Sequence, residues 1–289
     1  MANIFKQVGF NIMIRKAVVA GHFYEGERER LMKEIKNCFL KGTGALPEVK
    51  RGTGKIKGIV VPHAGYEYSG YVAACAYREI ARDGFPRKCI ILGPNHQGIG
   101  TTVAIMTDGE WETPLGTVPI ADDAKKYCTG IIENDEIAHQ YEHSIEVQLP
   151  FLQFLSNDFS FIPVCIGWQE WDIVREVGDI LSQADDVLFI ASSDFSHVDF
   201  SGFPSEREVD EQVKKKDMMA IGEILNLDAK GLVETVRRYG ITMCGYGAVA
   251  AMLQALKGKA TGARLLRYAT SYDVAPGTYC VGYAAIVIE

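Results

Sequence analysis

The chain has 289 residues, of which 47% are hydrophobic and 23% are charged, so it has enough apolar material for a core and is not disordered by composition. Its formal net charge is −7, and its basic residues are scattered apart from a cluster at 214–216, which excludes the basic stripe that nucleic-acid binding requires. No apolar run is long enough to span a bilayer, and Lys6 and Arg15 interrupt the N-terminal stretch, so we expect a cytoplasmic protein with no nucleic-acid or membrane partner.

From residue 14 onward, short β-rich runs alternate with helical patterns; we expect residues 1–12 to be a mobile leader and residues 1–289 to form one domain. Apolar runs predict strands at 16–20, 56–61, 88–92, 102–106, 159–165, 186–191, 263–269 and 279–287. Apolar spacing predicts helices at 26–40, 69–82, 121–130, 144–156, 170–183, 206–225, 229–238 and 245–257. This alternation predicts an α/β fold, a three-layer α/β/α sandwich around a mixed, largely parallel sheet, in which the last two strands form an antiparallel pair.

Two histidines directly follow strands of the buried type. His63 comes after Pro62 in IVVPHAGY, and His96 follows the same kind of run in CIILGPNHQG. Because the carboxyl ends of parallel strands face the crevice in which α/β proteins bind ligands, we expect both imidazoles there. One such histidine is better explained by hydrogen bonds to its own loop, whereas two matching ones favour a functional site. In the same motifs, Tyr66 and Asn95 are expected to contact a substrate.

Two further breaks carry Asp194 and His197 in LFIASSDFSH and His143 in EHSIE. The spacing of Asp194 and His197 lets a carboxylate orient an imidazole, although Asp194 or Ser193 would equally well cap the following turn. His143 precedes a predicted helix with Ser144 as its expected N-cap, so we expect the positive end of the helix dipole to lower the pKa of His143. A capping or packing role explains His143 equally well.

The last such break is MCGYG, in which Cys244 precedes a helix rich in small residues. The helix N-terminus is expected to stabilise the thiolate, which suits a metal ligand or a nucleophile; the alternative is a small residue that fills a tight turn. Two histidines and one anionic sulfur would leave positions on a single metal ion open for substrate. The sequence has no HExxH, P-loop, GxSxG or GxGxxG signature in a usable context.

Taken in chain order, seven motifs resemble those of the Memo family, whose prokaryotic branch is called AmmeMemoRadiSam system protein B: AVVAGHFY, PHAGYEYSG, ILGPNHQG, WETPLG, EHSIEVQLPFL, SSDFSH and CGYGAVAAML. The resemblance covers residues 16–289. The chain departs from the family in AGHFYEG, where it has His22 and Glu25 and the family more often has a small residue and a proline.

The resemblance implies the fold of the class III extradiol dioxygenases, which hold iron(II) with two histidines and a glutamate. By position, His63 and His96 match the histidine ligands, Cys244 matches the glutamate, His197 matches the acid/base residue and His143 matches a substrate-side histidine. A sulfur ligand favours copper(I), zinc or thiolate-bound iron, so ring cleavage does not transfer with the fold. The name of the branch implies an AMMECR1-type protein and a radical SAM enzyme as pathway partners.

Three functions are compatible with these residues. The first is an oxidoreductase that uses iron(II) or copper, in which His197 moves a proton while Asp194 and His143 tune the pocket. The second is a binding module that takes a small molecule or a peptide in the same cleft and needs no cofactor. The third is a hydrolase with Cys244 as nucleophile and His197 as its base.

Overall fold

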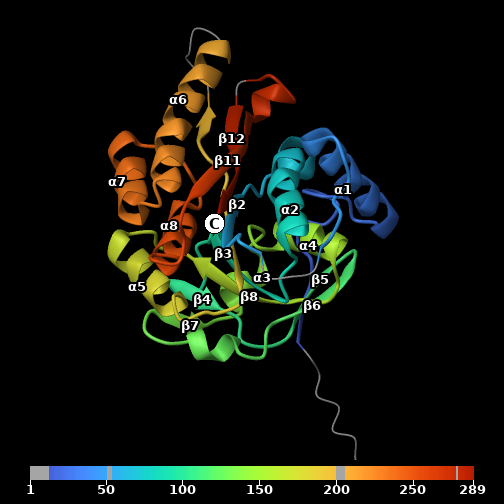
Figure 1. Ribbon diagram of the computed structural model, residues 1–289, viewed down its shortest axis with the longest axis vertical. Helices are drawn as coiled ribbons and strands as arrows, with labels where there is room; N and C mark the ends of the chain where they lie inside the picture. The colour runs from blue at the N-terminus through green and yellow to red at the C-terminus, as the bar shows by residue number, and fades with distance from the viewer. Residues whose placement is uncertain (1–12, 51–53, 200–205, 278) are drawn as a thin grey trace, which may run out of the picture.

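The computed structural model describes residues 13–50, 54–199, 206–277 and 279–289 and has an α/β fold (Figure 1). The predicted leader, residues 1–12, lies outside the described residues. Four adjacent parallel strands form the centre of the large sheet: β2 (Gly58–Val61), β9 (Leu188–Ser192), β3 (Lys88–Pro94) and β8 (Ser160–Ile166). Nearly all of their residues are buried, because layers on both faces cover the sheet, and such strands read as continuous apolar runs.

Antiparallel pairing extends this centre on both sides. On one side lie β12 (Tyr279–Ile288), β11 (Ala263–Thr270) and β10 (His197–Asp199), and on the other lie β4 (Val103–Ile105) and β7 (Ile132–Asn134). Among the described residues this sheet has nine strands. The predicted antiparallel pair of the last two strands, β11 and β12, is confirmed. The sheet is therefore mixed, as predicted, with its parallel strands mainly at the centre.

Helices cover the two faces of the sheet, which makes the predicted three layers (Figure 1). On one side lie α1 (Arg28–Thr43), α2 (Tyr71–Asp83) and α4 (Leu149–Leu155), and on the other lie α5 (Trp171–Leu181), α6 (Glu206–Leu225), α7 (Ala229–Tyr239) and α8 (Tyr246–Ala255). A short helix, α3, covers Ile137–Gln140. In α5 the buried residues Val174, Val177, Gly178 and Leu181 recur at the helical period, so one stripe of the helix packs inward.

The predicted strand at 16–20 is wrong. The chain forms only a two-residue strand, β1 (Ile14–Arg15), in a separate small sheet with β5 (Glu110–Thr113) and β6 (Gly116–Pro119). The backbone N–H groups of Val18 and Val19 donate instead to the carboxylate of Glu146, so they are not available for a strand ladder. The antiparallel β5–β6 hairpin lies in a segment for which no strand was predicted.

Two predicted helices are shorter than expected. The segment 121–130 contains only a 3₁₀ turn, η2 (Ala124–Tyr127), because the backbone of Ala121 is hydrogen-bonded to Phe161 in β8. The segment 144–156 begins with a 3₁₀ turn, η3 (Glu146–Gln148), and becomes α-helical only at Leu149. Pro150 has no N–H to donate and therefore sits in the first turn of α4.

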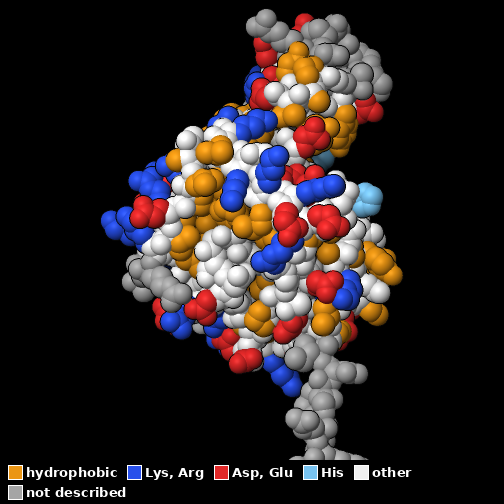
Figure 2. All heavy atoms as spheres, turned by 90° about the vertical axis from the view of Figure 1, so that its right-hand side faces the viewer, with side chains coloured by type: hydrophobic (Ala, Val, Ile, Leu, Met, Phe, Trp, Pro, Cys, Tyr) orange, Lys and Arg blue, Asp and Glu red, His pale blue; other side chains and the backbone are white. Residues whose placement is uncertain are grey.

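The parallel strands give the sheet two distinct edges. We call the edge beyond Val61, Pro94, Ile166 and Ser192 the carboxyl edge, and the opposite edge the amino edge. On the face shown in Figure 2, basic and acidic side chains both occur, with hydrophobic side chains between them. None of the helices in the described part of the chain is long and apolar enough to cross a membrane.

Candidate metal centre

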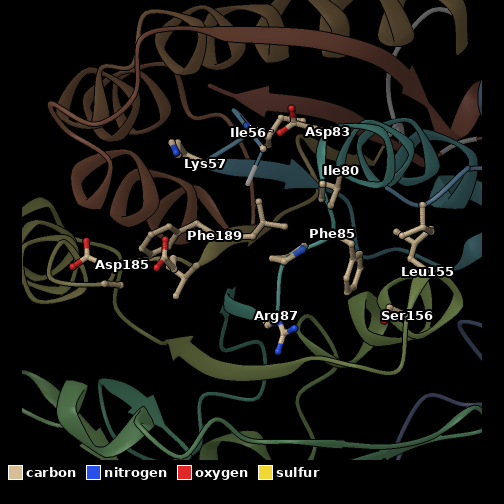
Figure 3. A pocket seen from close by; sticks show the side chains of 18 of the residues that line it. Ile56, Lys57, Ile80, Asp83, Phe85, Arg87, Leu155, Ser156, Asp185 and Phe189 are labelled. Atoms are coloured by element: carbon tan, nitrogen blue, oxygen red, sulfur yellow. Dashed lines mark hydrogen bonds between the residues drawn. The ribbon is translucent and has the colours of Figure 1, made fainter. Parts of the chain in front are cut away.

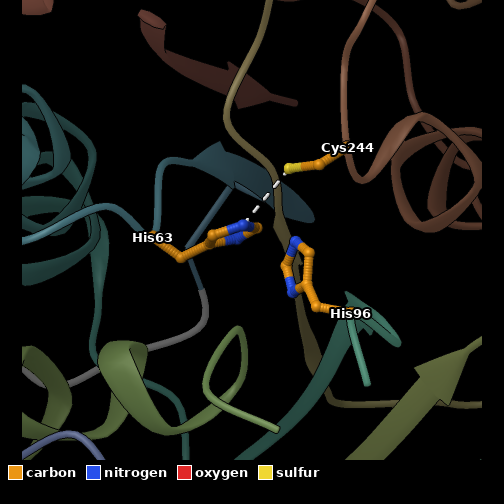
Figure 4. A group of neighbouring side chains, drawn as sticks. All are labelled: His63, His96 and Cys244. Atoms are coloured by element: carbon orange, nitrogen blue, oxygen red, sulfur yellow. Dashed lines mark hydrogen bonds between the residues drawn. The ribbon is translucent and has the colours of Figure 1, made fainter. Parts of the chain in front are cut away.

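The carboxyl edge brings two histidines and a cysteine together from three separate loops (Figure 4). His63 and His96 each stand two residues beyond the end of their strands, β2 and β3, and Cys244 lies in the loop before α8. One ligand atom from each of the three residues lies within 4.8 Å of the others. The sulfur of Cys244 is 3.2 Å from Nε2 of His63. Residues distant in sequence thus form the predicted group.

His63 is held in place through its Nδ1, on the side of the ring away from Cys244. Its side chain is buried, and its Nδ1 lies 2.9 Å from the hydroxyl of Ser192, the last residue of β9. Burial, followed by electrostatic interactions with the neighbouring imidazoles of His143 and His96, holds the pKa of His63 well below its usual range. The imidazole is therefore neutral at neutral pH, which is the form that binds a metal ion.

His96 is held by the carboxylate of Glu142, a residue that was not predicted to belong to the site. Oε1 of Glu142 lies 2.9 Å from Nδ1 of His96, and Oε2 accepts the backbone N–H of His96 at 2.6 Å. Oε1 also accepts the N–H groups of His143 and Ser144. Burial alone would raise the pKa of Glu142, but the hydrogen bond and charge of His96, with smaller contributions from His143 and Ser144, lower it to about 2. An ionised Glu142 accepts the Nδ1 proton of His96 and leaves its Nε2 free.

His143 is stacked on His96, with ring centroids 4.6 Å apart, and its edge faces Phe23 at 4.8 Å. Burial lowers the pKa of His143 to about 4, against the opposing charge of Glu142. The expected direction of the pKa is therefore correct, although burial and not the helix dipole is its main cause. The prediction that Ser144 caps the helix is wrong, because the hydroxyl of Ser144 donates to the carbonyl of Pro94. This hydrogen bond connects the segment before α4 to β3.

Gln169, from the loop after β8, holds the loop that carries Cys244. Its Nε2 donates to the carbonyl of Cys244 at 2.8 Å, and its Oε1 accepts the N–H of Gly247 at 2.6 Å. A Cβ atom at Gly247 would lie 2.7 Å from the side chain of Gln169, and one at Gly245 would lie 2.5 Å from the carbonyl of Ser192. Gly245 and Gly247 therefore have no room for a side chain, because the CGYG loop packs closely against Ser192 and Gln169. This close packing places the thiol of Cys244 beside His63.

The expected stabilisation of the Cys244 thiolate is wrong. Burial of the sulfur, followed by the negative charge of Asp194, raises the pKa of Cys244 well above its usual range. The imidazole that its sulfur contacts is His63, whereas the hydrolase hypothesis paired it with His197. Burial and Asp194 thus favour the neutral thiol of Cys244. A positive charge close by, such as a metal ion, would allow the thiol to lose its proton.

His197 and Asp194 lie beside this group. Nδ1 of His197 lies 3.2 Å from the carbonyl of Thr242, which can only accept, so Nδ1 carries the proton and Nε2 is free. Nε2 lies 3.9 Å from the carboxylate of Asp194. Asp194 also accepts the N–H groups of His63 and Ala64, so it fastens the loop of His63 and does not cap its own turn. Ser193 accepts the N–H of Gly245 and likewise contacts another loop.

Tyr66 and Asn95, which were predicted to contact a substrate, both make hydrogen bonds within the protein. Tyr66 lies in a π-helical turn, η1 (Tyr66–Gly70); its side chain is buried against Phe151 and its hydroxyl donates to the carbonyl of Val147. The amide of Asn95 is engaged within its own loop, where it donates to Ile99 and accepts two backbone N–H groups. Their geometry supports structural roles, in packing and in shaping the GPNHQG loop.

The first loop, residues 16–27, follows β1 and is anchored by a buried ion pair between Arg15 and Glu146. Glu146 also accepts the hydroxyl of Tyr24, next to the Phe23 ring that contacts His143. The departure from the family at Glu25 has a compensating contact, since its N–H, which a proline lacks, donates to Glu34 at 2.8 Å. These contacts hold residues 23–25 beside His143.

The donor set fits a metal ion. Both imidazoles have one nitrogen engaged behind them, by Ser192 and by Glu142, and the thiol of Cys244 completes a set of nitrogen and sulfur atoms. A second group, His96, Glu142 and His143, also has ligand atoms within 4.8 Å of one another, but the oxygens of Glu142 are already engaged by N–H groups.

A cavity of about 1090 Å³ lies at the amino edge, away from these residues (Figure 3). Its lining includes the apolar side chains of Phe85, Leu155 and Phe189 and the exposed side chains of Lys57 and Arg87. No histidine or cysteine is among its lining residues in the described part of the chain.

Sequence reasoning missed the residues behind the candidate ligands. Glu142, Gln169 and Ser192 contact them directly, and Gln148 donates a hydrogen bond to Ser192. Two of them were within reach, because Glu142 stands beside His143 in EHSIE and Ser192 opens SSDFSH. Gln148 and Gln169 carry no such signal, since a glutamine near a strand or helix end is ordinary.

The chain matches the family described as Memo-like protein over residues 15–287. It is 45% identical to a MEMO1 family protein of Methanopyrus kandleri, over 96% of this chain and 99% of that protein, and 40% identical to one of Methanobrevibacter smithii, over 96% and 100%. The crystal structure of an uncharacterized protein from Escherichia coli K12 matches with a TM-score of 0.49 at 14% identity, over 81% of this chain and 100% of that chain.

Proposed function

The chain belongs to the Memo family, and from this premise we propose that His63, His96 and Cys244 hold a redox-active metal ion, iron(II) or copper, in an oxidoreductase. The observation that carries the proposal is the convergence of two imidazole nitrogens and a thiol sulfur within 4.8 Å. When bound, such an ion would supply one-electron chemistry and a Lewis-acidic position for a substrate. The sulfur donor makes copper(I) or thiolate-bound iron better suited than an ion that prefers only oxygen.

His197 is the proposed acid/base residue. Its Nδ1 proton is engaged by Thr242, so a proton taken from a substrate would go to Nε2. There the carboxylate of Asp194, 3.9 Å away, would stabilise the imidazolium. Its side chain is 30% exposed, so a substrate in the cleft has access to it.

His143 is proposed to contact the substrate as a neutral imidazole. With a pKa of about 4, it carries no charge at neutral pH and can donate one hydrogen bond or accept one. Because His143 is stacked on His96, a substrate that it orients would lie beside the ligand set. The substrate is proposed to be a small molecule.

The test is metal analysis of protein prepared anaerobically, wild type against Cys244→Ala. We expect the wild type to bind Fe(II) or Cu(I) in an equimolar amount and the variant to lose more than about 100-fold in affinity, because even changes behind the ligands cost about 10–100-fold. Cys128→Ala, at a half-buried cysteine outside the cleft, is the matched control. Equal metal content in wild type and Cys244→Ala would overturn the proposal.

The second candidate is a non-catalytic module that binds a peptide in the same cleft. It is favoured by the aromatic side chains beside the histidines, since Phe23 faces His143 and Tyr279, 52% exposed, lies 6.3 Å from His197. Such rings suit contacts with a peptide. Ligand binding that survives His197→Ala would support this candidate, whereas a turnover that His197→Ala abolishes would exclude it.

A further inference from the structure

Behind His63 lies a chain of buried polar side chains that runs through Ser192 and Gln148 to Tyr77. None of these four residues is more than 2% exposed, so their hydrogen bonds must be satisfied within the protein. Each of their contacts is between 2.6 and 2.9 Å long. The donor and acceptor of every hydrogen bond in this series of four side chains follow from two backbone carbonyls.

The first carbonyl belongs to Pro62 and fixes the orientation of Gln148. A carbonyl oxygen can only accept, so the atom of Gln148 that lies 2.9 Å from it must be the amide nitrogen. The amide oxygen then accepts the hydroxyl of Tyr77 at 2.8 Å. The second amide hydrogen is directed at Oγ of Ser192, 2.8 Å away. Ser192 is therefore an acceptor toward Gln148.

The second carbonyl belongs to Ser144 and takes the only hydrogen that Ser192 has to donate, at 2.6 Å. The contact at 2.9 Å between Oγ of Ser192 and Nδ1 of His63 must then have the imidazole as donor. Nδ1 of His63 is protonated, and Nε2 of the neutral ring keeps its lone pair. That lone pair faces the sulfur of Cys244, 3.2 Å away.

We propose that Ser192, oriented by Gln148, is a positioning residue that locks His63 in the Nδ1–H tautomer and so presents Nε2 as the metal-binding atom. Its importance for a metal ion rests on the function proposed above. Glu142 does the same for His96, but with an anion, so the two imidazoles differ in donor strength: a neutral hydroxyl supports one and a carboxylate supports the other.

The tautomer is tested directly on the metal-free protein. Long-range ¹H–¹⁵N NMR spectra of protein with ¹⁵N-labelled histidine distinguish protonated from unprotonated ring nitrogens, and the spectrum of His63→Gln assigns the signals of His63. We expect a protonated Nδ1 and an unprotonated Nε2. A protonated Nε2 in the wild type would overturn the proposal, whatever the protein binds.

Variants at Ser192 separate positioning from mere packing. We expect Ser192→Ala to lose the preference for the Nδ1–H form and to bind Fe(II) or Cu(I) about 10–100-fold more weakly, and Ser192→Thr, which keeps the hydroxyl, to restore both. The control is Ser271→Ala, which removes another buried serine hydroxyl, the acceptor of the Val281 N–H. An unchanged tautomer in Ser192→Ala would refute the role of Ser192. If the wild type binds neither ion but shows the expected tautomer, the proposed function fails and the assignment of His63 stands.

Discussion

The two edges of the central sheet differ in what they do with their polar side chains. The amino edge has a cavity of about 1090 Å³ with Lys57 and Arg87 exposed at its wall, and none of its lining residues belongs to a candidate metal-binding group in the described part of the chain. The carboxyl edge brings ligand atoms of His63, His96 and Cys244 within 4.8 Å, each held by hydrogen bonds from behind. The cavity and the candidate metal centre therefore lie at opposite edges of the sheet.

The reason lies in the parallel strands. Loops that leave the carboxyl ends of β2, β3 and β9 deliver His63, His96 and Asp194 to one crevice, each two residues beyond its strand. Buried polar atoms there must find partners, and those partners fix the direction of each side chain. If this difference between the edges is correct, substitutions at the carboxyl edge will alter metal binding and those at the amino edge will not.

The largest effect is expected from Glu142→Ala. It leaves the ring and the N–H of His96 and the N–H groups of His143 and Ser144 without their acceptor, so we expect a loss of about 3 kcal/mol or more in the free energy of unfolding. Metal affinity should fall by about 100-fold. Urea unfolding and metal titration measure the two effects.

The matched change at the amino edge is Asp83→Ala, which removes the carboxylate that accepts the N–H of Ile56. It should cost about 1 kcal/mol and leave metal affinity unchanged. Equal loss of metal affinity in Glu142→Ala and Asp83→Ala would remove the distinction between the edges.

Acid should also act through the carboxyl edge, at His139 in α3. Burial, and then the charge of Arg15, lowers the pKa of His139 to about 4. The unfolded chain takes up this proton near pH 6.5 and the folded protein only near pH 4, so the contribution of His139 to stability is complete above pH 6.5 and is lost, by about 3 kcal/mol, toward pH 4. His143 and His63, whose pKa values are also lowered, add to the loss in the same direction. Urea unfolding at about pH 7, 5.5 and 4, a range that spans the titration of histidine, measures this loss.

His139→Leu should reduce that pH-dependent loss by about 3 kcal/mol, because the side chain no longer titrates. His22→Gln, at an exposed histidine of the first loop, should leave the pH dependence as it is in the wild type. If both variants lose stability as steeply as the wild type between pH 6.5 and 4, His139 is not the source of the acid sensitivity.

A smaller effect is expected from Gln169→Ala, which releases the Cys244 loop without removing a ligand. Loss of its bonds to Cys244 and Gly247 should let the thiol react several-fold faster with iodoacetamide and weaken metal binding by about 10-fold. The control is Gln153→Ala, which breaks a glutamine bridge to Thr113 and Gly116 outside the cleft. Equal alkylation rates in wild type and Gln169→Ala would contradict the proposed role of Gln169.

The smallest effect is expected at the wall of the amino-edge cavity. Arg87→Ala changes an exposed side chain, so stability should stay within about 0.5 kcal/mol of the wild type and metal content should not change. A clear loss of metal in Arg87→Ala would mean that the two edges are coupled.

By itself, the sequence determined the α/β class, the central strands and the three residues that converge as candidate metal ligands. Buried parallel strands are long apolar runs, and helices such as α5 and α6 show clear apolar spacing or length, so local pattern is sufficient for them. It was insufficient at 16–20, where the carboxylate of Glu146, more than a hundred residues away, takes the N–H groups that a strand would use.

Only the tertiary structure decided how the candidates are arranged. It paired Cys244 with His63 and not with His197, and raised the pKa of the thiol by burial where the nearby helix alone suggested the opposite. It moved Tyr66 into the core and brought in Glu142, Gln148 and Ser192 behind the imidazoles. Burial and hydrogen-bond direction depend on atoms far apart in the chain, so residue spacing can name candidate ligands but cannot say which nitrogen each histidine presents.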